Sequence, residues 1–213
     1  MTSSRPRIYV LAGVNGAGKS SIGGAAFRAS GADYYNPDEA ARKLMPANPN
    51  LSQAELNSAA WHQGVRLLKQ AIEERLDFAF ETTLGANTIP RLLGQAVSQG
   101  IEIYVWYVGL SGPELHIERV QARVRRGGHD IPTEHIRRRY EHSRLNLVEF
   151  LPRLTGLRVF DNSADADPAV GRMPKLKLVL HMERGKILNP RDLSHTPNWA
   201  KPIVAAALKL SRR

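Results

Sequence analysis

Residues 13 to 20 read Gly13-Val14-Asn15-Gly16-Ala17-Gly18-Lys19-Ser20, which is the phosphate-loop pattern of Gly, four further residues, Gly, Lys and Ser or Thr. The apolar run Arg7 to Ala12 predicts a strand just before the loop, and the segment that opens at Lys19 predicts a helix through about Ser30. Glycines in such a loop let successive backbone N–H groups point at phosphate oxygens, and the helix start adds its positive dipole end. Because motif and context agree, a nucleotide triphosphate site is a better interpretation than a Gly-rich turn without a ligand.

Individual residues of this loop are expected to bind different parts of a nucleotide. Lys19 is expected to reach the β- and γ-phosphates of ATP and to take part in catalysis, while the Ser20 hydroxyl is expected to ligate Mg²⁺. ATP and Mg²⁺ are therefore the expected cofactors. The expected nucleotide-binding residues are Gly13, Asn15, Gly16, Ala17, Gly18, Lys19, Ser20 and Ser21.

Predicted strands and helices alternate along most of the chain. Further strands are predicted at residues 33–36, 78–81, 101–108 and 157–160, and helices at 37–44, 86–99 and from a capping box of Ser52 and Glu55 to about residue 75. Ser111 and Glu114 predict the cap of a helix that runs to Gly127, and another helix is predicted from residue 132 to 150. A hairpin at 176–182 and 186–188 and a short helix at 203–210 complete the prediction.

This order predicts an α/β fold of the P-loop NTPase type, a three-layer sandwich whose mostly parallel central sheet is covered by helices on both faces. Residues 1–165 are expected to form the core, which includes a helical lid at 119–144. Residues 166–213 are expected to form a small C-terminal hairpin and helix that pack on the same domain. A length of 213 residues, of which 42% are hydrophobic, favours one sizeable core.

Composition narrows the class of protein without naming a partner. The chain has no cysteine, no apolar stretch near the roughly 20 residues needed to cross a bilayer, and no apolar signal region, so we expect a soluble, cytoplasmic protein. The formal net charge is +10, and 22 of the 30 cationic residues are Arg, many of them between Arg119 and Arg144. Such a cluster suits phosphate binding, although a solvated basic helix face explains any single Arg equally well.

Asp38 is the proposed general base for an acceptor hydroxyl. It follows the second predicted strand, and ligands bind at the carboxyl ends of parallel strands. The alternative is that Asp38 only stabilises the first turn of a helix, where a carboxylate is favourable. Arg42, one turn further along, is counted with the expected substrate-binding residues.

A second polar group follows the strand predicted at residues 78–81. Glu81, Thr82 and Thr83 lie at the edge where the site is expected to open, and they are the other expected substrate-binding residues. A carboxylate at this place suits either substrate hydroxyls or Mg²⁺, and the sequence leaves both open. A surface ion pair is the structural alternative for Glu81.

The region from Arg119 to Arg144 resembles a mobile lid, because Gly127-Gly128-His129 lies between two predicted helices rich in cations. Closure would exclude water and bring guanidinium groups to the charge that develops on a transferring phosphoryl group. The leading candidates are Arg123, Arg125, Arg138 and Arg139, of which Arg125 and Arg139 are predicted to be catalytic.

Four segments together resemble the zeta-toxin-like P-loop kinases: Ala12 to Ser21, Asn36-Pro-Asp-Glu39, Phe80-Glu-Thr-Thr-Leu84, and Arg123 to His129 with Ile136 to Tyr140. Zeta toxins phosphorylate a hydroxyl of UDP-N-acetylglucosamine with ATP. The resemblance implies the same class of acceptor, Asp38 as the catalytic base and Glu81 as a contact of the sugar. It also implies an antitoxin-like protein partner.

Two other functions stay open at this point. One is a nucleotide or polynucleotide kinase, which the basic charge suits, and nucleic acid is therefore not excluded as a partner. The other is a P-loop ATPase that uses the nucleotide as a conformational signal and binds nucleic acid or a protein. Removal of the Asp38 carboxylate distinguishes them, because it should abolish phosphoryl transfer by a kinase while a switch keeps its partner binding.

Overall fold

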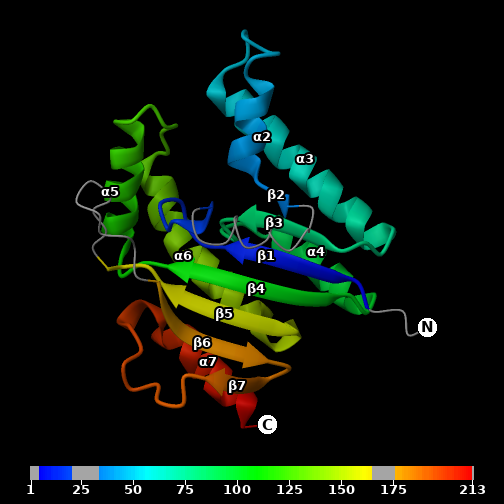
Figure 1. Cartoon of the computed structure of the whole chain (residues 1–213), viewed down its shortest axis with the longest axis vertical. Coiled ribbons are helices and arrows are strands. Elements are labelled where there is room, and N and C mark those ends of the chain that lie inside the picture. Colours follow the sequence, from blue (N-terminus) through cyan, green and yellow to red (C-terminus); the bar gives the residue numbers. More distant parts are fainter. Residues whose placement is uncertain (1–4, 21–33, 165–175, 213) are drawn as a thin grey trace.

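The computed structural model describes residues 5–20, 34–164 and 176–212. Its centre is a seven-stranded sheet in the order β2-β3-β1-β4-β5-β6-β7 (Figure 1). The strands are β1 (Arg7–Ala12), β2 (Tyr34–Tyr35), β3 (Phe78–Thr82), β4 (Glu102–Gly109), β5 (Gly156–Asp161), β6 (Lys177–Glu183) and β7 (Lys186–Asn189).

The sheet is parallel from β2 to β5 and antiparallel at its C-terminal edge. The predicted mostly parallel α/β sheet is thus confirmed. The predicted hairpin of β6 and β7 continues this sheet, because β6 pairs with β5. Parallel pairing places the carboxyl ends of β1, β2 and β3 at one edge, where polar side chains from distant parts of the sequence meet.

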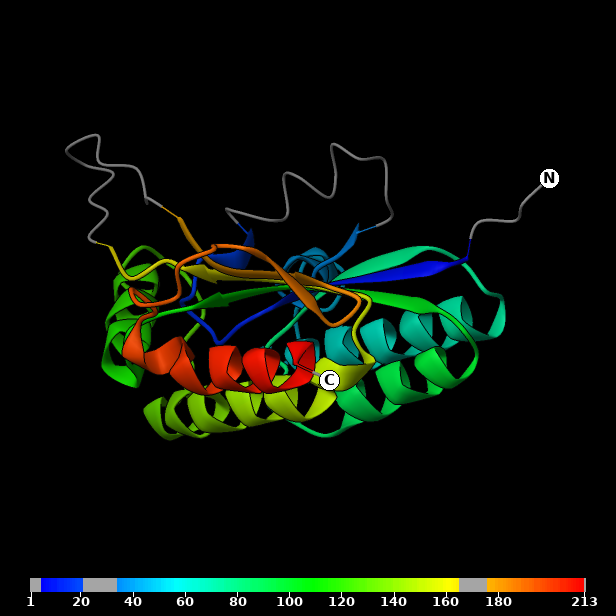
Figure 2. The same cartoon turned by 90° about the horizontal axis from the view of Figure 1, so that it is seen from below.

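The helices α3, α4, α6 and α7 cover one face of this sheet (Figure 2). The helix predicted from Lys19 to about Ser30 lies largely outside the described residues. The helices are α2 (Pro37–Leu44), α3 (Gln53–Glu73), α4 (Thr88–Ser98), α5 (Pro113–Val124), α6 (Thr133–Phe150) and α7 (Lys201–Ser211), with short 3-10 turns at Leu151–Arg153 and Asn198–Ala200.

Alternation along the strands separates two apolar clusters. On β1, Ile8, Val10 and Ala12 are fully buried in the main core beneath the helices. Leu11, which lies between Val10 and Ala12 in the sequence, belongs to a smaller cluster with Ala17, Ala79 and Val108. Successive side chains of a strand point to opposite faces, so the small cluster lies on the face away from α3 and α4. The two clusters fix β1 at the centre of the sheet, and with it the start of the phosphate loop.

Helix starts were predicted with mixed success. The capping box of Ser52 and Glu55 is confirmed, since both reciprocal bonds are present at the start of α3. The cap predicted at Ser111 is wrong: Gly112 is the cap residue of α5, no side chain bonds the helix start, and Pro113 is the first helical residue. Ser111 lies one residue too early to reach the free N–H groups. In the described part of the chain, no helix is long and apolar enough to span a membrane.

Candidate active site

The candidate site lies at the carboxyl ends of β2, β3 and β1. The register pairs Leu11 with Glu81 and Tyr35 with Phe80, so the residues that follow these strands lie side by side. The phosphate loop follows β1 and Asn36 follows β2, while Glu81 is near the end of β3. Three segments that are distant in the sequence therefore form one site.

Two glycines allow the phosphate loop to fold tightly against its neighbours. Gly13 has φ +144° and an added Cβ would lie 2.2 Å from the Val108 carbonyl oxygen. Gly16 has φ +82°, and its Cβ would lie 2.6 Å from the carbonyl oxygen of His116. Side chains are excluded at both positions by backbone conformation as well as by space. Gly13 and Gly16 are thus required by the loop's backbone conformation and by its close approach to β4 and α5.

Glu81 is the centre of a buried polar network beneath the loop. Its Oε1 lies 3.4 Å from Lys19 Nζ, and its Oε2 accepts hydrogen bonds from the Ser20 hydroxyl at 2.8 Å and the Tyr34 hydroxyl at 2.8 Å. Asn36 Nδ2 donates to the same oxygen at 3.1 Å. Lys19 and Glu81 are only 6% and 7% exposed, so the carboxylate pairs with a cation that would otherwise be buried alone.

The Ser20 hydroxyl is oriented in a way that suits a metal ion. It donates a hydrogen bond to Glu81 Oε2 at 2.8 Å and accepts one from Asn36 Nδ2 at 3.2 Å. A hydroxyl has one donor and two lone pairs, so among the residues that the structure describes one lone pair of Ser20 is left for a cation. Mg²⁺ favours one or two protein oxygens together with substrate phosphates, and this donor set fits that habit. Across residues 5–20, 34–164 and 176–212, no cluster of three His, Asp or Glu side chains offers an all-protein site.

Asp38 lies in the first turn of α2 with its side chain half exposed. One carboxylate oxygen, Oδ2, is 3.7 Å from Arg123 Nη1 on α5. Arg42 is exposed on the same helix, and its Nε donates to the Asp38 carbonyl at 3.4 Å. The structure thus brings Asp38 to Arg123 of α5 and keeps Arg42 next to Asp38.

Arg139 of α6 reaches the phosphate loop directly. Its Nη1 donates a 2.8 Å hydrogen bond to Asn15 Oδ1. Burial is the main cause that lowers the pKa of Arg139, the neighbouring Arg138 lowers it further, and the negative charge of Asp38 acts in the opposite direction. Arg139 therefore bonds the phosphate loop through Asn15 and also lies within range of the negative charge of Asp38.

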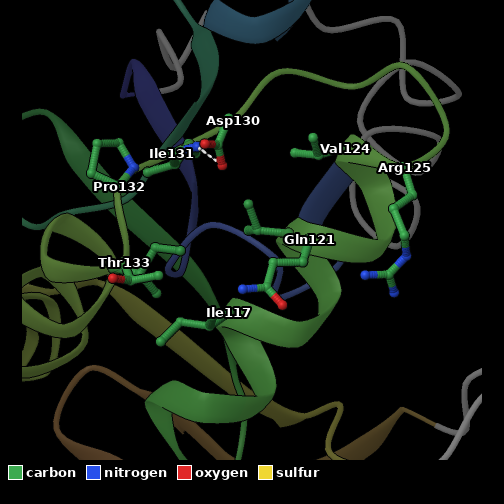
Figure 3. Close-up of a pocket in the computed structure, with 10 residues that line it drawn as sticks. Ile117, Gln121, Val124, Arg125, Asp130, Ile131, Pro132 and Thr133 are labelled. Atoms are coloured by element: carbon green, nitrogen blue, oxygen red, sulfur yellow. Dashed lines mark hydrogen bonds between the residues drawn. The ribbon is translucent and has the colours of Figure 1, made fainter.

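Arg123, and not Arg125, faces Asp38. Arg123 Nη2 donates to the His129 carbonyl at 3.0 Å, and its Nε is buried with no hydrogen-bond partner in the described structure. The His129 ring lies 3.2 Å from Asn57 Nδ2 of α3, which links the lid to the helices beside Asp38. Arg125 is exposed at the end of α5 and points away from Asp130 and Ile131 (Figure 3).

Other expected site residues make structural contacts. The Thr82 carbonyl accepts from Gly13 N–H at 3.2 Å and the Thr83 carbonyl accepts from Ser143 Oγ at 2.6 Å. These bonds hold the loop and α6 to the end of β3. Ala17 is buried and Gly18 has a positive φ, as the loop requires, and Ser21 lies outside the described residues.

Two supports of the loop have no signal in the sequence. His116 is fully buried in α5, and its Nδ1 lies 2.8 Å from the Asn15 carbonyl oxygen. Burial lowers the pKa of His116 to about 4, so the imidazole is neutral at physiological pH. Asn162 Nδ2, just after β5, donates to the Ala17 carbonyl at 2.9 Å. A lone His and an Asn in a turn do not reveal such long-range contacts.

A cavity of about 350 Å³ with a mixed polar and apolar lining lies between α5, α6 and the loop that joins them (Figure 3). It does not contain Asp38, Lys19 or Glu81. Its volume is therefore separate from the polar network under the phosphate loop. It is lined by Ile117, Val120, Gln121, Val124, Arg125, Asp130, Ile131, Pro132, Thr133 and Ile136.

Known proteins resemble this chain in sequence and in structure. An uncharacterized protein of Haemophilus influenzae strain Rd is 30% identical over 129 residues, which are 60% of this chain and 88% of that protein. The structure of AvrRxo1-ORF1 with -ORF2 and ATP has a TM-score of 0.67 at 16% identity; the match covers 96% of this chain, which spans only 64% of that one. A structure of the PezAT toxin–antitoxin system of Streptococcus pneumoniae has a TM-score of 0.60 at 14% identity and covers 100% of this chain and 88% of that one.

At identities of 16% and 14%, the two solved structures show that this chain shares their α/β fold and no more. The family is established by the sequence itself. The model described as Zeta toxin matches residues 1–166, which include the phosphate loop, Asp38, Glu81 and the whole lid. This chain therefore belongs to the zeta toxin family.

Proposed function

We propose that this protein is a kinase that transfers the γ-phosphoryl group of ATP to a hydroxyl group of a small metabolite. The acceptor we propose is a UDP-sugar, with UDP-N-acetylglucosamine as the first compound to test. Family membership supports the acceptor class, and the geometry of the site supports the reaction type. A cytoplasmic location and an antitoxin-like protein partner belong to the same proposal and rest on the family alone.

ATP binding is supported by the phosphate loop and the buried network below it. The N–H groups of the loop and the Lys19 ammonium supply positive charge for the β- and γ-phosphates. Ser20 would hold Mg²⁺, which supplies charge neutralisation of the phosphates when bound. Lys19 pairs with Glu81 at 3.4 Å, and the loop is braced by Asn162 and His116. A rigid cradle of this kind needs little reorganisation when a nucleotide enters.

The single observation that carries phosphoryl transfer is the position of Asp38. Its half-exposed carboxylate faces Arg123 of the lid, and its charge acts on Arg139, which bonds the phosphate loop. A half-exposed carboxylate just after β2, at the sheet edge where the phosphate loop also begins, can accept the proton of an attacking hydroxyl. The two arginines can stabilise the charge that develops on the transferring group, as lid arginines do in phosphoryl transfer.

Mass spectrometry of the reaction products tests this proposal. The protein is incubated with ATP, Mg²⁺ and, in turn, a panel of UDP-sugars, free nucleotides and an oligonucleotide with a 5′-hydroxyl. We expect a phosphorylated UDP-sugar with the intact protein and a loss of at least about a hundredfold with Asp38→Asn, since general-base catalysis contributes that much. A phosphorylated oligonucleotide would establish a polynucleotide kinase instead.

Arg123→Ala and Arg125→Ala form a matched pair, because they remove the same side chain two residues apart at the C-terminal end of α5. We expect Arg123→Ala to reduce transfer and Arg125→Ala to leave it nearly unchanged. Equal loss in both variants would show that the lid contributes only its general charge.

A further inference from the structure

Asn36 uses its whole side-chain amide in two directions. It is only 4% exposed and follows β2 directly. On one side its Nδ2 donates to Ser20 Oγ at 3.2 Å and to Glu81 Oε2 at 3.1 Å. On the other side its Oδ1 accepts from the N–H groups of Asp38 at 2.9 Å and Glu39 at 3.2 Å. An amide has two donor hydrogens and two acceptor lone pairs, so its capacity is filled.

The sheet register explains why one residue can bridge these groups. β2 pairs with β3 so that Tyr35 lies beside Phe80, which brings the next residue, Asn36, beside Glu81. The same residue is the N-cap of α2, and Pro37 at the first helical position has no N–H group to satisfy. Asn36 therefore stands between the Ser20–Glu81 pair and the helix that carries Asp38.

We propose that Asn36 is a positioning residue that orients the Ser20 hydroxyl and the Glu81 carboxylate toward Mg²⁺-bound nucleotide and ties them to the helix of Asp38. This inference rests on the proposed function. By donating to Ser20 Oγ, the amide occupies one lone pair of the hydroxyl, while the hydroxyl hydrogen is engaged in the hydrogen bond to Glu81. The one lone pair that is left then has a fixed direction.

Few other side chains can do both tasks. Aspartate can cap α2 but has no donor for Glu81, to which it would also present a like charge. Serine and threonine can cap the helix, but they lack the second arm that reaches Ser20 and Glu81. Replacement of Asn36 by Ser thus separates the two functions: the helix cap stays, and the orientation of Ser20 and Glu81 is lost.

The test measures binding of a non-hydrolysable ATP analogue by calorimetry, with and without Mg²⁺. For Asn36→Ser we expect affinity without Mg²⁺ to stay within about twofold of the intact protein. The gain in affinity that Mg²⁺ provides should fall about tenfold or more, as expected for a lost hydrogen bond to a charged group. If Asn36→Ser does not fold, as judged by circular dichroism, Asn36→Thr carries the same measurement.

A control variant separates orientation from simple capping. Ser52→Ala removes the cap of α3, which is exposed and belongs to a different helix. We expect it to lower the melting temperature and to leave the Mg²⁺ gain unchanged. If Ser52→Ala also reduced the gain in ATP-analogue affinity that Mg²⁺ provides, the proposal would be overturned. Loss of a helix cap anywhere would then be enough to explain the effect of Asn36→Ser.

A double-mutant cycle with Ser20→Ala shows whether Asn36 acts through Ser20. The effect of Asn36→Ser on the Mg²⁺ gain should disappear in the Ser20→Ala background. An effect of full size in that background, or an unchanged Mg²⁺ gain in Asn36→Ser itself, would overturn the proposal. All these readouts are binding measurements, so they decide the role of Asn36 even if no acceptor is phosphorylated, and such a failure would count against the proposed function alone.

Discussion

Acidification should destabilise this protein in large part through His116. The ring is fully buried in α5 beneath the phosphate loop, and its Nδ1 lies 2.8 Å from the Asn15 carbonyl oxygen. Burial is the main cause that lowers its pKa to about 4, the charges of Lys19, Arg119 and Arg144 lower it further, and the bond to Asn15 opposes them. Protonation of His116 would therefore place a buried positive charge, without a carboxylate partner among the described residues, next to the phosphate loop.

The magnitude follows from the difference between the folded and unfolded states. The unfolded chain takes up a proton on His116 near pH 6.5, whereas the folded chain takes it up only near pH 4. Between these values the unfolded state binds more protons, so the free energy of unfolding falls as the pH falls. The contribution of His116 is fully present above pH 6.5 and about 3 kcal/mol is lost by pH 4, at about 1.4 kcal/mol for each pH unit.

Urea unfolding at pH 7, 6, 5 and 4 measures this loss, with His116→Asn as the matched variant. The asparagine amide can still donate to the Asn15 carbonyl but does not titrate. Glu55 and Asp192, whose pKa values are lowered by hydrogen bonds to Ser52 and Ser194, cost stability at the acid end in both proteins alike. We expect the intact protein to lose about 3 kcal/mol more than the variant between pH 7 and pH 4. If the free energy of unfolding fell by the same amount between pH 7 and pH 4 in the intact protein and in His116→Asn, the reasoning would be refuted.

Two packing predictions and one binding prediction follow from other contacts. Gly109→Ala should cost about 1–3 kcal/mol in urea unfolding, because the added Cβ would lie 2.3 Å from Trp199 Cη2, and unchanged stability would contradict that close packing. Tyr107→Phe should cost about 1 kcal/mol in the same assay through the lost 3.0 Å bond to a buried serine of α6, and a stabilised variant would contradict it. Asn15→Ala should weaken binding of an ATP analogue about tenfold, since Arg139 loses its 2.8 Å partner, and unchanged affinity in calorimetry would argue against this bond in the bound state.

Much of the fold could be predicted because local patterns and tertiary packing agree. The strand predicted at Arg7 to Ala12 has the same bounds in the structure, since its alternate residues fill the two apolar clusters of the sheet. The helix predicted at residues 37–44 also has the same bounds, fixed by Asn36 as cap and Pro37 as first residue. The start of α5 was missed because proline at the first helical position, and not Ser111, sets it.

Site residues within one short motif could be predicted from the sequence. Site residues that contact the motif from distant parts of the chain could not. Lys19 and Ser20 follow from the motif, whereas His116 contacts a residue 101 positions earlier and Asn162 one 145 positions earlier. Arg123, in the last turn of α5, and Arg125, the residue just after the helix, are two positions apart and therefore point in different directions. The spacing of arginines in the sequence does not show which face of α5 points toward Asp38. That orientation is set by the packing of Ile117 and Val120 against Val14 of the phosphate loop.

The destination of the γ-phosphoryl group tests the central claim most directly. ATP whose γ-phosphoryl oxygens carry oxygen-18 is incubated with the protein, Mg²⁺ and UDP-N-acetylglucosamine, and the products are weighed by mass spectrometry. The account predicts that the label appears in a phosphorylated UDP-sugar and that this product is lost with Asp38→Asn. Label found only in inorganic phosphate, in equal amounts with the intact protein and the variant, would contradict the account and indicate an ATPase.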